Sequence, residues 1–449
     1  MFNRFLLIVM ISVAYGVAAQ TNFPYSSAGV GERLNSVHPV FSGMGNQSVT
    51  YAYPSVLNTS NPATYSYLRH QFPIFSVGFS TRLSFNQADS IKEFNSSSNI
   101  SEIAFGLSFA KRFGLAFGLK PVYKKSYSIT EKYLLMEDSV RYDYMGNGTL
   151  NKAFIGFSVN ILNYKSFKWS VGGNVGGVFG TVQDERRSSI ETAIAKPGGV
   201  ETRSQHLRSF HYDLGTLIQY HIKNGHMISV GGTYEPQQQI RSSYNRQLSY
   251  SASDVSNPNT YQLLTESGEL KGKILFASSY NVGVSYSKIL KTTKKDGGER
   301  NAQLMVAASY SATDWSKYRE NYSDTSFSYN LKNSSGFQVG VQYIPETQYF
   351  GNLMPKFFER INYRVGFYSN ALPYMYNGAQ LNEWAATVGF GIPVLVDKRL
   401  DSSIQLGVGV GKRGNNQPGA MNETFVAVNL GILIAPGIND RWFVKRKLD

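Results

Sequence analysis

Three glycines near the C-terminus, Gly409, Gly411 and Gly414, have the G-x-G-x-x-G spacing that can cradle a dinucleotide phosphate. That chemistry needs a strand before the glycines and a helix that begins at the last of them. Here the flanking residues alternate between apolar and small or polar side chains, and no helical pattern follows. We therefore interpret the glycines as part of a strand and expect no nucleotide cofactor.

Histidine could bind a metal ion or act as a base, and the chain has six. His206 and His211 are five residues apart in a segment with strand character, so their side chains leave opposite faces and cannot share a metal ion. The chain has no Cys, which excludes thiolate metal sites and thiol nucleophiles. No local nucleophile signature of a hydrolase is present either. The sequence thus predicts no enzyme, no cofactor and no metal site.

The elements that would position any site are strands, because apolar residues recur at every second position of the sequence. Ile404, Leu406, Val408 and Val410 alternate with small or polar residues, which is the signature of a strand with one apolar face. Fourteen segments share this pattern: 72–86, 98–110, 113–127, 150–162, 167–182, 205–222, 226–241, 273–288, 301–313, 326–343, 359–374, 380–393, 401–412 and 421–434. Several have ten or more residues, which is long enough for a tilted strand to cross a membrane.

The connections between these segments alternate in length. Those after the second, fourth, sixth and twelfth segments are tight, whereas 128–149 and 184–203 are long and polar. An even strand count, with short turns at one end and long loops at the other, is typical of an outer-membrane barrel. We therefore predict an all-β fold, a transmembrane antiparallel β-barrel of about 14 strands over residues 71–434. A soluble β-sandwich is the alternative, because its strands would alternate in the same way.

The first 19 residues have the form of a secretory signal peptide. One Arg precedes the apolar run FLLIVMISVAYGVA, and small residues allow cleavage after Ala19. A membrane anchor is the competing interpretation, but the run is short for a span and no stop-transfer charges follow. No other apolar run reaches 18 residues, so any membrane insertion must be by β-barrel. The expected location is the cell outer membrane.

Residues 20–70 show little sustained alternation and many Gly, Ser and Asn. A barrel of fourteen strands encloses more space than its own side chains fill. We therefore expect this segment to form a plug, or hatch, inside the barrel. Residues 435–449 are predicted to be a basic tail on the periplasmic side.

The net charge is +14, from 44 Lys and Arg against 30 Asp and Glu. A secreted chain has little access to nucleic acid, so we expect no nucleic-acid partner. The positive charges instead collect at the predicted short-turn end, where they would face anionic lipid or an acidic periplasmic protein. This basic rim consists of Lys111, Arg112, Lys165, Lys223, Lys288, Lys294, Lys295, Lys356, Arg360, Lys398, Arg399, Arg441, Lys445, Arg446 and Lys447.

Two short stretches, SGMGN (42–46) and LNTSNPATYS (57–66), resemble the FadL-like family of long-chain fatty-acid transporters in the outer membrane. That family has a fourteen-stranded barrel with an N-terminal hatch, so the resemblance implies a hatch motif at Gly43, Gly45, Asn61, Pro62 and Ala63. It also implies release of an apolar ligand sideways through a kink in the wall.

Two further groups of residues are candidate sites. Gly172, Gly173, Gly176 and Gly177 are candidates for a lateral-opening kink, because glycine pairs weaken a strand, although ordinary barrel curvature also explains them. Tyr374, Met375 and Tyr376 form an exposed apolar cluster beside a short outer connection, which predicts a ligand or partner surface. The alternative for that cluster is the aromatic girdle of the barrel.

These observations leave three functional hypotheses. The first is a channel for passive uptake of hydrophobic small molecules, such as fatty acids or aromatic hydrocarbons, gated by the hatch. The second is a structural barrel subunit of an outer-membrane secretion or protein-assembly complex, with other outer-membrane or periplasmic proteins as partners. An open, water-filled porin is the third. In all of them the outer-membrane lipid surrounds the wall.

Overall fold

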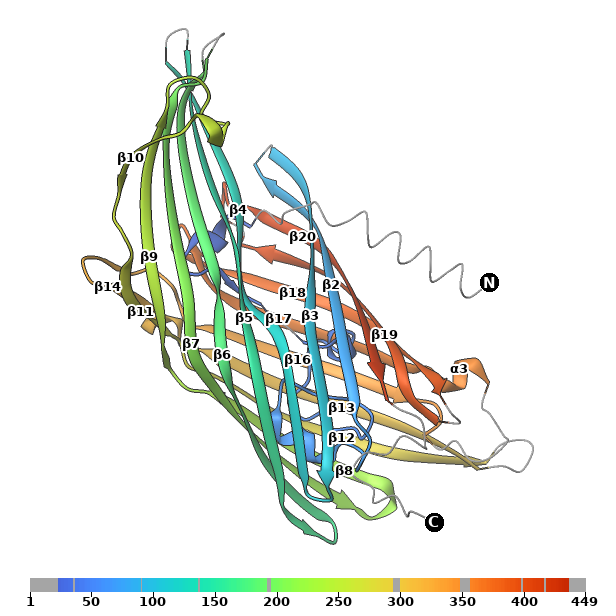
Figure 1. Ribbon diagram of the computed structural model, residues 1–449. Coiled ribbons are helices and arrows are strands. Elements are labelled where there is room, and N and C mark those ends of the chain that lie inside the picture. The colour runs from blue at the N-terminus through green and yellow to red at the C-terminus, as the bar shows by residue number, and fades with distance from the viewer. Residues whose placement is uncertain are drawn as a thin grey trace.

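A computed structural model describes residues 23–34, 37–89, 91–135, 138–191, 195–293, 299–347, 356–396, 399–415 and 417–435 (Figure 1). The predicted signal peptide and the tail beyond residue 435 lie outside them. One antiparallel sheet closes on itself, because the first long strand pairs with the last from Phe75–Ile434 to Gln87–Asn422. No helix in this part of the chain is both long and apolar enough to cross a membrane.

Fourteen strands form the wall, as predicted. Three of them are interrupted and carry two labels each: β8 with β9, β11 with β12, and β13 with β14. In chain order the wall is β2 (Ile74–Ala88), β3 (Ile91–Ala110), β4 (Phe113–Leu135), β5 (Asp138–Tyr164), β6 (Phe167–Glu191), β7 (Gly198–Ile222), β8 (His226–Glu235) with β9 (Gln238–Ser251), β11 (Leu270–Phe276) with β12 (Ser279–Thr293), β13 (Glu299–Thr313) with β14 (Arg319–Tyr322), β16 (Ser334–Ile344), β17 (Asn362–Tyr376), β18 (Ala379–Val396), β19 (Arg399–Gly414) and β20 (Asn422–Ile434).

Short elements connect or flank these strands. They are η3 (Lys223–Gly225), η4 (Pro258–Thr260), β10 (Gln262–Glu266), η5 (Trp315–Lys317), β15 (Ser326–Phe327) and α3 (Phe357–Arg360). The predicted tight turn after β17 is confirmed, since Asn377 and Gly378 both have positive φ, 46° and 78°.

The alternation of residue types places apolar side chains on the outside. In β19, Val410 is 51% exposed, whereas Gln405 and Gly407 face the interior. The same pattern exposes Tyr280, Tyr286 and Trp384, which are aromatic residues of the kind that form the girdles of a membrane barrel. An apolar exterior around a polar interior is the arrangement of a membrane-spanning barrel.

The strands on one side are longer than predicted. The pairs β4–β5 and β6–β7 extend to Leu135–Asp138 and to Ser189–Gly198, so most of the predicted long loops are hairpins. Their pattern was missed because both faces of a strand are polar beyond the membrane, while backbone pairing continues unchanged. Figure 1 shows this side standing well beyond the rest of the barrel. We call that end the outer end, and the end with the short turns the inner end.

The described part of the basic rim lies at the inner end, as predicted. Lys111 and Arg112 form the β3–β4 turn, Lys165 the β5–β6 turn and Lys223 the β7–β8 turn. Other rim positions, Lys294, Lys295, Lys398, Arg441, Lys445, Arg446 and Lys447, are outside the described residues.

Residues 23–34 and 37–72, which we call the hatch, run inside the barrel from the outer end toward the inner end (Figure 1). Their short elements are η1 (Pro24–Ser27), β1 (Glu32–Arg33), α2 (Pro39–Ser42) and η2 (Pro62–Tyr67). Proline occupies the first turn of each helix, where its missing N–H costs nothing. β1 pairs with β4 from within the lumen.

Candidate functional site

A belt of glycines in the wall surrounds the hatch. Thirteen of the fourteen wall strands each place one glycine so close that an added Cβ atom would lie within 2.9 Å of a hatch atom. This glycine belt consists of Gly78, Gly106, Gly114, Gly156, Gly172, Gly215, Gly231, Gly283, Gly340, Gly366, Gly389, Gly407 and Gly431. The fourteenth strand, β13, has the small residue Ala307 buried in the same core. The hatch therefore fills the lumen at this level and meets some of these glycines with its backbone and others with side chains.

The two glycines of the predicted hatch motif are part of this contact. A Cβ atom on Gly43 would lie 2.5 Å from the Cα atom of Gly389. Gly45 has a positive φ of 65°, which favours glycine, and its N–H donates to the hydroxyl of Thr387 at 2.8 Å. Both positions thus hold the hatch against the wall strands β17 to β19.

The Asn-Pro-Ala part of the motif fastens the other side of the hatch. The Asn61 side chain caps η2 by accepting from the N–H of Ala63 at 3.1 Å. Its amide donates to the carbonyl of Val49 in the hatch at 2.7 Å and to that of Thr216 in β7 at 3.2 Å. Pro62 lies against Gly172 of the belt.

Buried charges occupy the lumen between the hatch and the outer end. Arg413 contacts three carboxylates, those of Glu383 at 2.5 Å, Glu32 at 2.7 Å and Glu423 at 3.5 Å. Arg82 contacts Glu423 at 2.8 Å and Glu383 at 3.1 Å. Because Glu32 belongs to the hatch and the others to the wall, this network ties the two together. Each charged group of the network has a partner of opposite charge, which offsets the cost of removing it from water.

A second set of charges lies against the strands on the other side of the lumen. Arg33 donates to Glu235 at 2.6 Å, and the Nε2 atom of His211 lies 2.8 Å from the same carboxyl group. Lys152 forms an ion pair with Asp213. The neighbouring hatch residues Glu32 and Arg33 thus reach two different charge clusters. His206, by contrast, is exposed on the outside, so the two histidines do face opposite ways as predicted.

A cavity of about 490 Å³ lies among these charges. Aromatic rings form part of its lining, with Tyr123 4.8 Å from Phe276 and 6.2 Å from Trp315 between ring centroids. The cavity can therefore hold a small molecule against an aromatic surface, while the charges around it are neutralised mainly by one another.

The wall has a seam between β3 and β4. Their ladder stops at Ile103–Leu119, although both strands continue toward the outer end. Pro121 follows at once, and proline has no N–H to continue a ladder. Beyond it, Lys124 Nζ donates to Ser97 Oγ at 2.6 Å and bridges the two strands by side chains. Figure 1 shows the β2–β3 hairpin separating from β4 here, and residues of both strands line the cavity.

The four glycines proposed for a kink lie in β6, which pairs with β5 and β7 throughout this stretch. Gly172 belongs to the glycine belt, and a Cβ atom on Gly176 would lie 1.9 Å from the carbonyl oxygen of Ala153. Gly173 and Gly177 have more room, with nearest neighbours at 3.2 and 3.5 Å. A lateral opening at these residues stays a prediction, and the interrupted ladder at the seam is in a different place.

The expected surface at Tyr374, Met375 and Tyr376 is covered by the start of the hatch. The ring of Phe23 meets Tyr374 edge-on at 5.8 Å, and Tyr25 stacks on Tyr374 at 6.4 Å. Tyr374 is consequently only 6% exposed, so the expectation that this cluster is open to the outside was wrong for that residue. The sequence could not show that the chain begins its path through the barrel at this end.

The closed fourteen-stranded wall and the internal hatch define a FadL-like outer-membrane β-barrel. Within that class, the chain belongs to the BamG family, whose model matches residues 1–449. No curated protein matches the sequence.

Solved structures share this fold at low sequence identity. The toluene transporter TbuX of Ralstonia pickettii is 12% identical at a TM-score of 0.51, and the match covers 88% of this chain and 97% of TbuX. A FadL homologue of Pseudomonas aeruginosa is 9% identical at a TM-score of 0.52, and the match covers 88% of this chain and 97% of the homologue. The toluene transporter TodX of Pseudomonas putida is 11% identical at a TM-score of 0.50, and the match covers 91% of this chain and 98% of TodX.

Proposed function

We propose that this protein is an outer-membrane channel for hydrophobic small molecules. A ligand would enter from the outer end, rest in the 490 Å³ cavity and leave sideways through the seam between β3 and β4. The hatch would gate the route by keeping the inner end closed. The observation that carries the proposal is the seam itself, because an interrupted ladder beside a cavity offers an exit that avoids the glycine belt.

Two further observations support this function. The buried rings of Tyr123, Phe276 and Trp315 form part of the cavity lining, so an aromatic or aliphatic molecule in the cavity would lie next to apolar groups. The named relatives TbuX and TodX are toluene transporters with the same fold. Aromatic hydrocarbons and fatty acids are therefore the ligand classes to test.

The experiment is to tie the seam shut. The chain has no native Cys, so Ser97→Cys with Lys124→Cys introduces the only two thiols, and a short bifunctional thiol reagent that contains a disulfide bond can join them across the seam. Cross-linking should abolish uptake of labelled toluene or oleate, and reductive cleavage of the linker should restore it.

A matched control places the two thiols at Ala386 and Val410, which face each other in the complete β18–β19 ladder. Cross-linking there should leave uptake unchanged. If the joined seam transports as fast as the open one, the lateral route is wrong.

A second function is favoured by a separate observation, the long outer part of β4 to β7. Leu134 there is 87% exposed, and Leu263 and Leu264 of β10 are 59% and 63% exposed. Apolar side chains projecting beyond the membrane suit contact with another protein. We propose, as the alternative, a structural subunit of an outer-membrane secretion or assembly complex.

Purification in a mild detergent distinguishes the two functions. A stable complex with other outer-membrane or periplasmic proteins, lost on Leu134→Ser with Leu263→Ser, would support the subunit function. A lone monomer that still restores uptake in a deletion strain would support the channel.

A further inference from the structure

The outer face of the wall has a second interruption, between β7 and the strand made of β8 and β9. Residues 208–213 lie opposite residues 235–241 without ladder pairs, so six residues face seven. Gln238 fills part of this break with its side chain. Its amide accepts from the N–H of Tyr212 at 3.0 Å and donates to the carbonyl of Tyr212 at 2.9 Å. The wall stays closed here, but its outer face is uneven.

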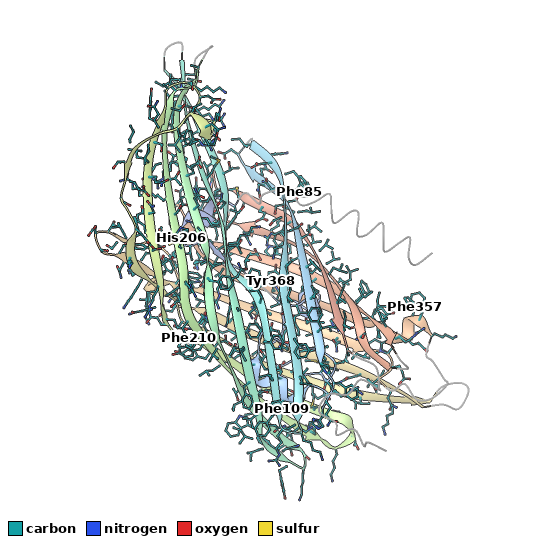
Figure 2. All side chains as sticks on the ribbon, viewed as in Figure 1. Phe85, Phe109, His206, Phe210, Phe357 and Tyr368 are labelled. Atoms are coloured by element: carbon teal, nitrogen blue, oxygen red, sulfur yellow. The ribbon has the colours of Figure 1, made fainter. Side chains whose placement is uncertain are left out.

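An open groove of about 930 Å³ lies at this interruption. Phe179, Arg208, Phe210 and Arg241 line it, and Phe210 is 62% exposed. Gly177 forms part of its floor, where an added Cβ atom would meet only Ser209 O, at 3.5 Å. Figure 2 shows Phe210 on the outside of the wall, with His206 nearer the outer end. The groove is thus basic toward the outside, and toward the membrane it has aromatic residues, Phe210 and Tyr212, on one side and the exposed amides of Gln237 and Gln239 on the other.

Three cations form a row along the outer edge of this groove. Arg241 pairs with Lys273 of β11, and the Leu207–Ser242 pair places Arg208 next to Arg241 on the other side. All three side chains are exposed. Like charges on neighbouring strands repel each other and destabilise the sheet. No carboxylate in the described part of the chain lies within 4.0 Å of them, so this cost is not offset within the protein.

The depth of the row in the membrane follows from β7. Tyr220 and Phe210 are both outward and exposed, at 50% and 62%, and lie ten residues apart. Ten residues of strand span about 33 Å, or about 25 Å along the barrel axis at the usual tilt, which matches the apolar band of such barrels. Arg208 is the next outward residue beyond Phe210. The row therefore lies at the level of the lipid headgroups on the outer side.

We propose that this row and groove bind a phosphorylated lipid of the outer leaflet. The headgroup phosphate accepts hydrogen bonds from Arg208, Arg241 and Lys273, and guanidinium groups suit phosphate because they bind it with two parallel N–H donors. An acyl chain then lies in the groove over Gly177 and against Phe210. The ligand relieves the mutual repulsion of the three cations.

Native mass spectrometry of the full-length barrel tests this site. The probes are bisphosphorylated lipid A, net-neutral phosphatidylcholine and inorganic pyrophosphate. We expect the wild type to retain one lipid A, and the variant Arg208→Gln, Arg241→Gln, Lys273→Gln to bind it at least tenfold more weakly. Gly177→Phe, whose Cβ atom has room at this position, should fill the groove, weaken lipid A binding and leave pyrophosphate binding unchanged.

The control variant removes three cations at the inner end, Lys165→Gln, Lys223→Gln and Lys288→Gln, and should bind lipid A like the wild type. Equal binding by the wild type and the outer variant would overturn the proposal, as would equal loss in the control. Phosphatidylcholine bound as tightly as lipid A would refute phosphate recognition. Pyrophosphate bound as tightly as lipid A would show a free-anion site instead of a lipid site.

Discussion

Gly43 of the hatch lies so close to Gly389 of the wall that a Cβ atom added to Gly43 would be only 2.5 Å from the Cα atom of Gly389. The reverse also holds, since a Cβ atom on Gly389 would lie 2.7 Å from the Cα atom of Gly43. Neither strand nor hatch can yield by rotating a side chain, because the contact is between backbones. Gly389 is one of the thirteen belt glycines, some of which meet hatch backbone and others hatch side chains, and together these contacts make the hatch a close-packed part of the barrel.

Replacing Gly389 by Leu should displace the hatch from the wall. The new side chain has no space next to Gly43, so either the hatch or the wall strand must move. Overpacking of this kind destabilises a protein by about 1–3 kcal/mol or more. We expect the variant to show ion conductance in planar bilayers that the wild type lacks. Gly409→Ala is the control, because a Cβ atom there meets its nearest neighbour at 3.4 Å. If neither variant shows ion conductance, the contact between Gly43 and Gly389 does not hold the hatch in place.

Arg413→Gln should destabilise the barrel strongly. The change removes the nearest cation from the buried Glu383 and from the half-buried Glu32, and breaking one side of a buried ion pair costs about 3–5 kcal/mol. Urea unfolding in detergent measures the loss. Adding Glu383→Gln to the variant should recover part of the stability, because Arg82 is then the only cation of the network and one of its three carboxylates is removed. A double variant as unstable as the sum of the two single variants would argue against coupling.

The repeating features of this chain could be predicted from sequence. Alternation such as that of Ile404 to Val410 is local, so the strand count followed from it. Gly43 and Asn61 could be placed in a hatch by resemblance, and both lie against the wall.

The long-range relationships could not be predicted in the same way. Arg413 and Glu32 are 381 residues apart, and nothing local marks them as partners. The seam had one local signal, Pro121, in a segment interpreted as a transmembrane strand, where a missing N–H interrupts a ladder. Tyr374 was expected to be exposed because its cover, Phe23, comes from the other end of the sequence.

Tyr374→Ala should release the start of the hatch. Two ring contacts would be lost, to Phe23 and to Tyr25, and aromatic pairs contribute about 0.5–1.5 kcal/mol each beyond buried area. We expect protease added to intact cells to cleave near the N-terminus of the variant but not of the wild type. Tyr374→Phe keeps the ring and should stay resistant. Equal resistance of the alanine variant would mean that other contacts hold this segment.

The stability of the hatch should depend on pH through His38. This side chain is fully buried, and burial lowers its pKa to about 3, with a smaller contribution from Arg364. Its Nδ1 atom accepts from the N–H of Val40 and caps α2, which requires an unprotonated nitrogen. The unfolded chain takes up a proton below pH 6.5 whereas the folded protein does not, so stability is complete above that pH and falls as the pH is lowered.

The expected loss between pH 7 and pH 5 is about 2 kcal/mol, because each unit below 6.5 costs about 1.4 kcal/mol. Unfolding by urea at the two pH values measures it. His38→Asn keeps an N-cap acceptor without a titrating group, so the difference between the two pH values should shrink by that amount. An unchanged difference in the variant would assign the pH dependence to other groups, such as the carboxylates around Arg413.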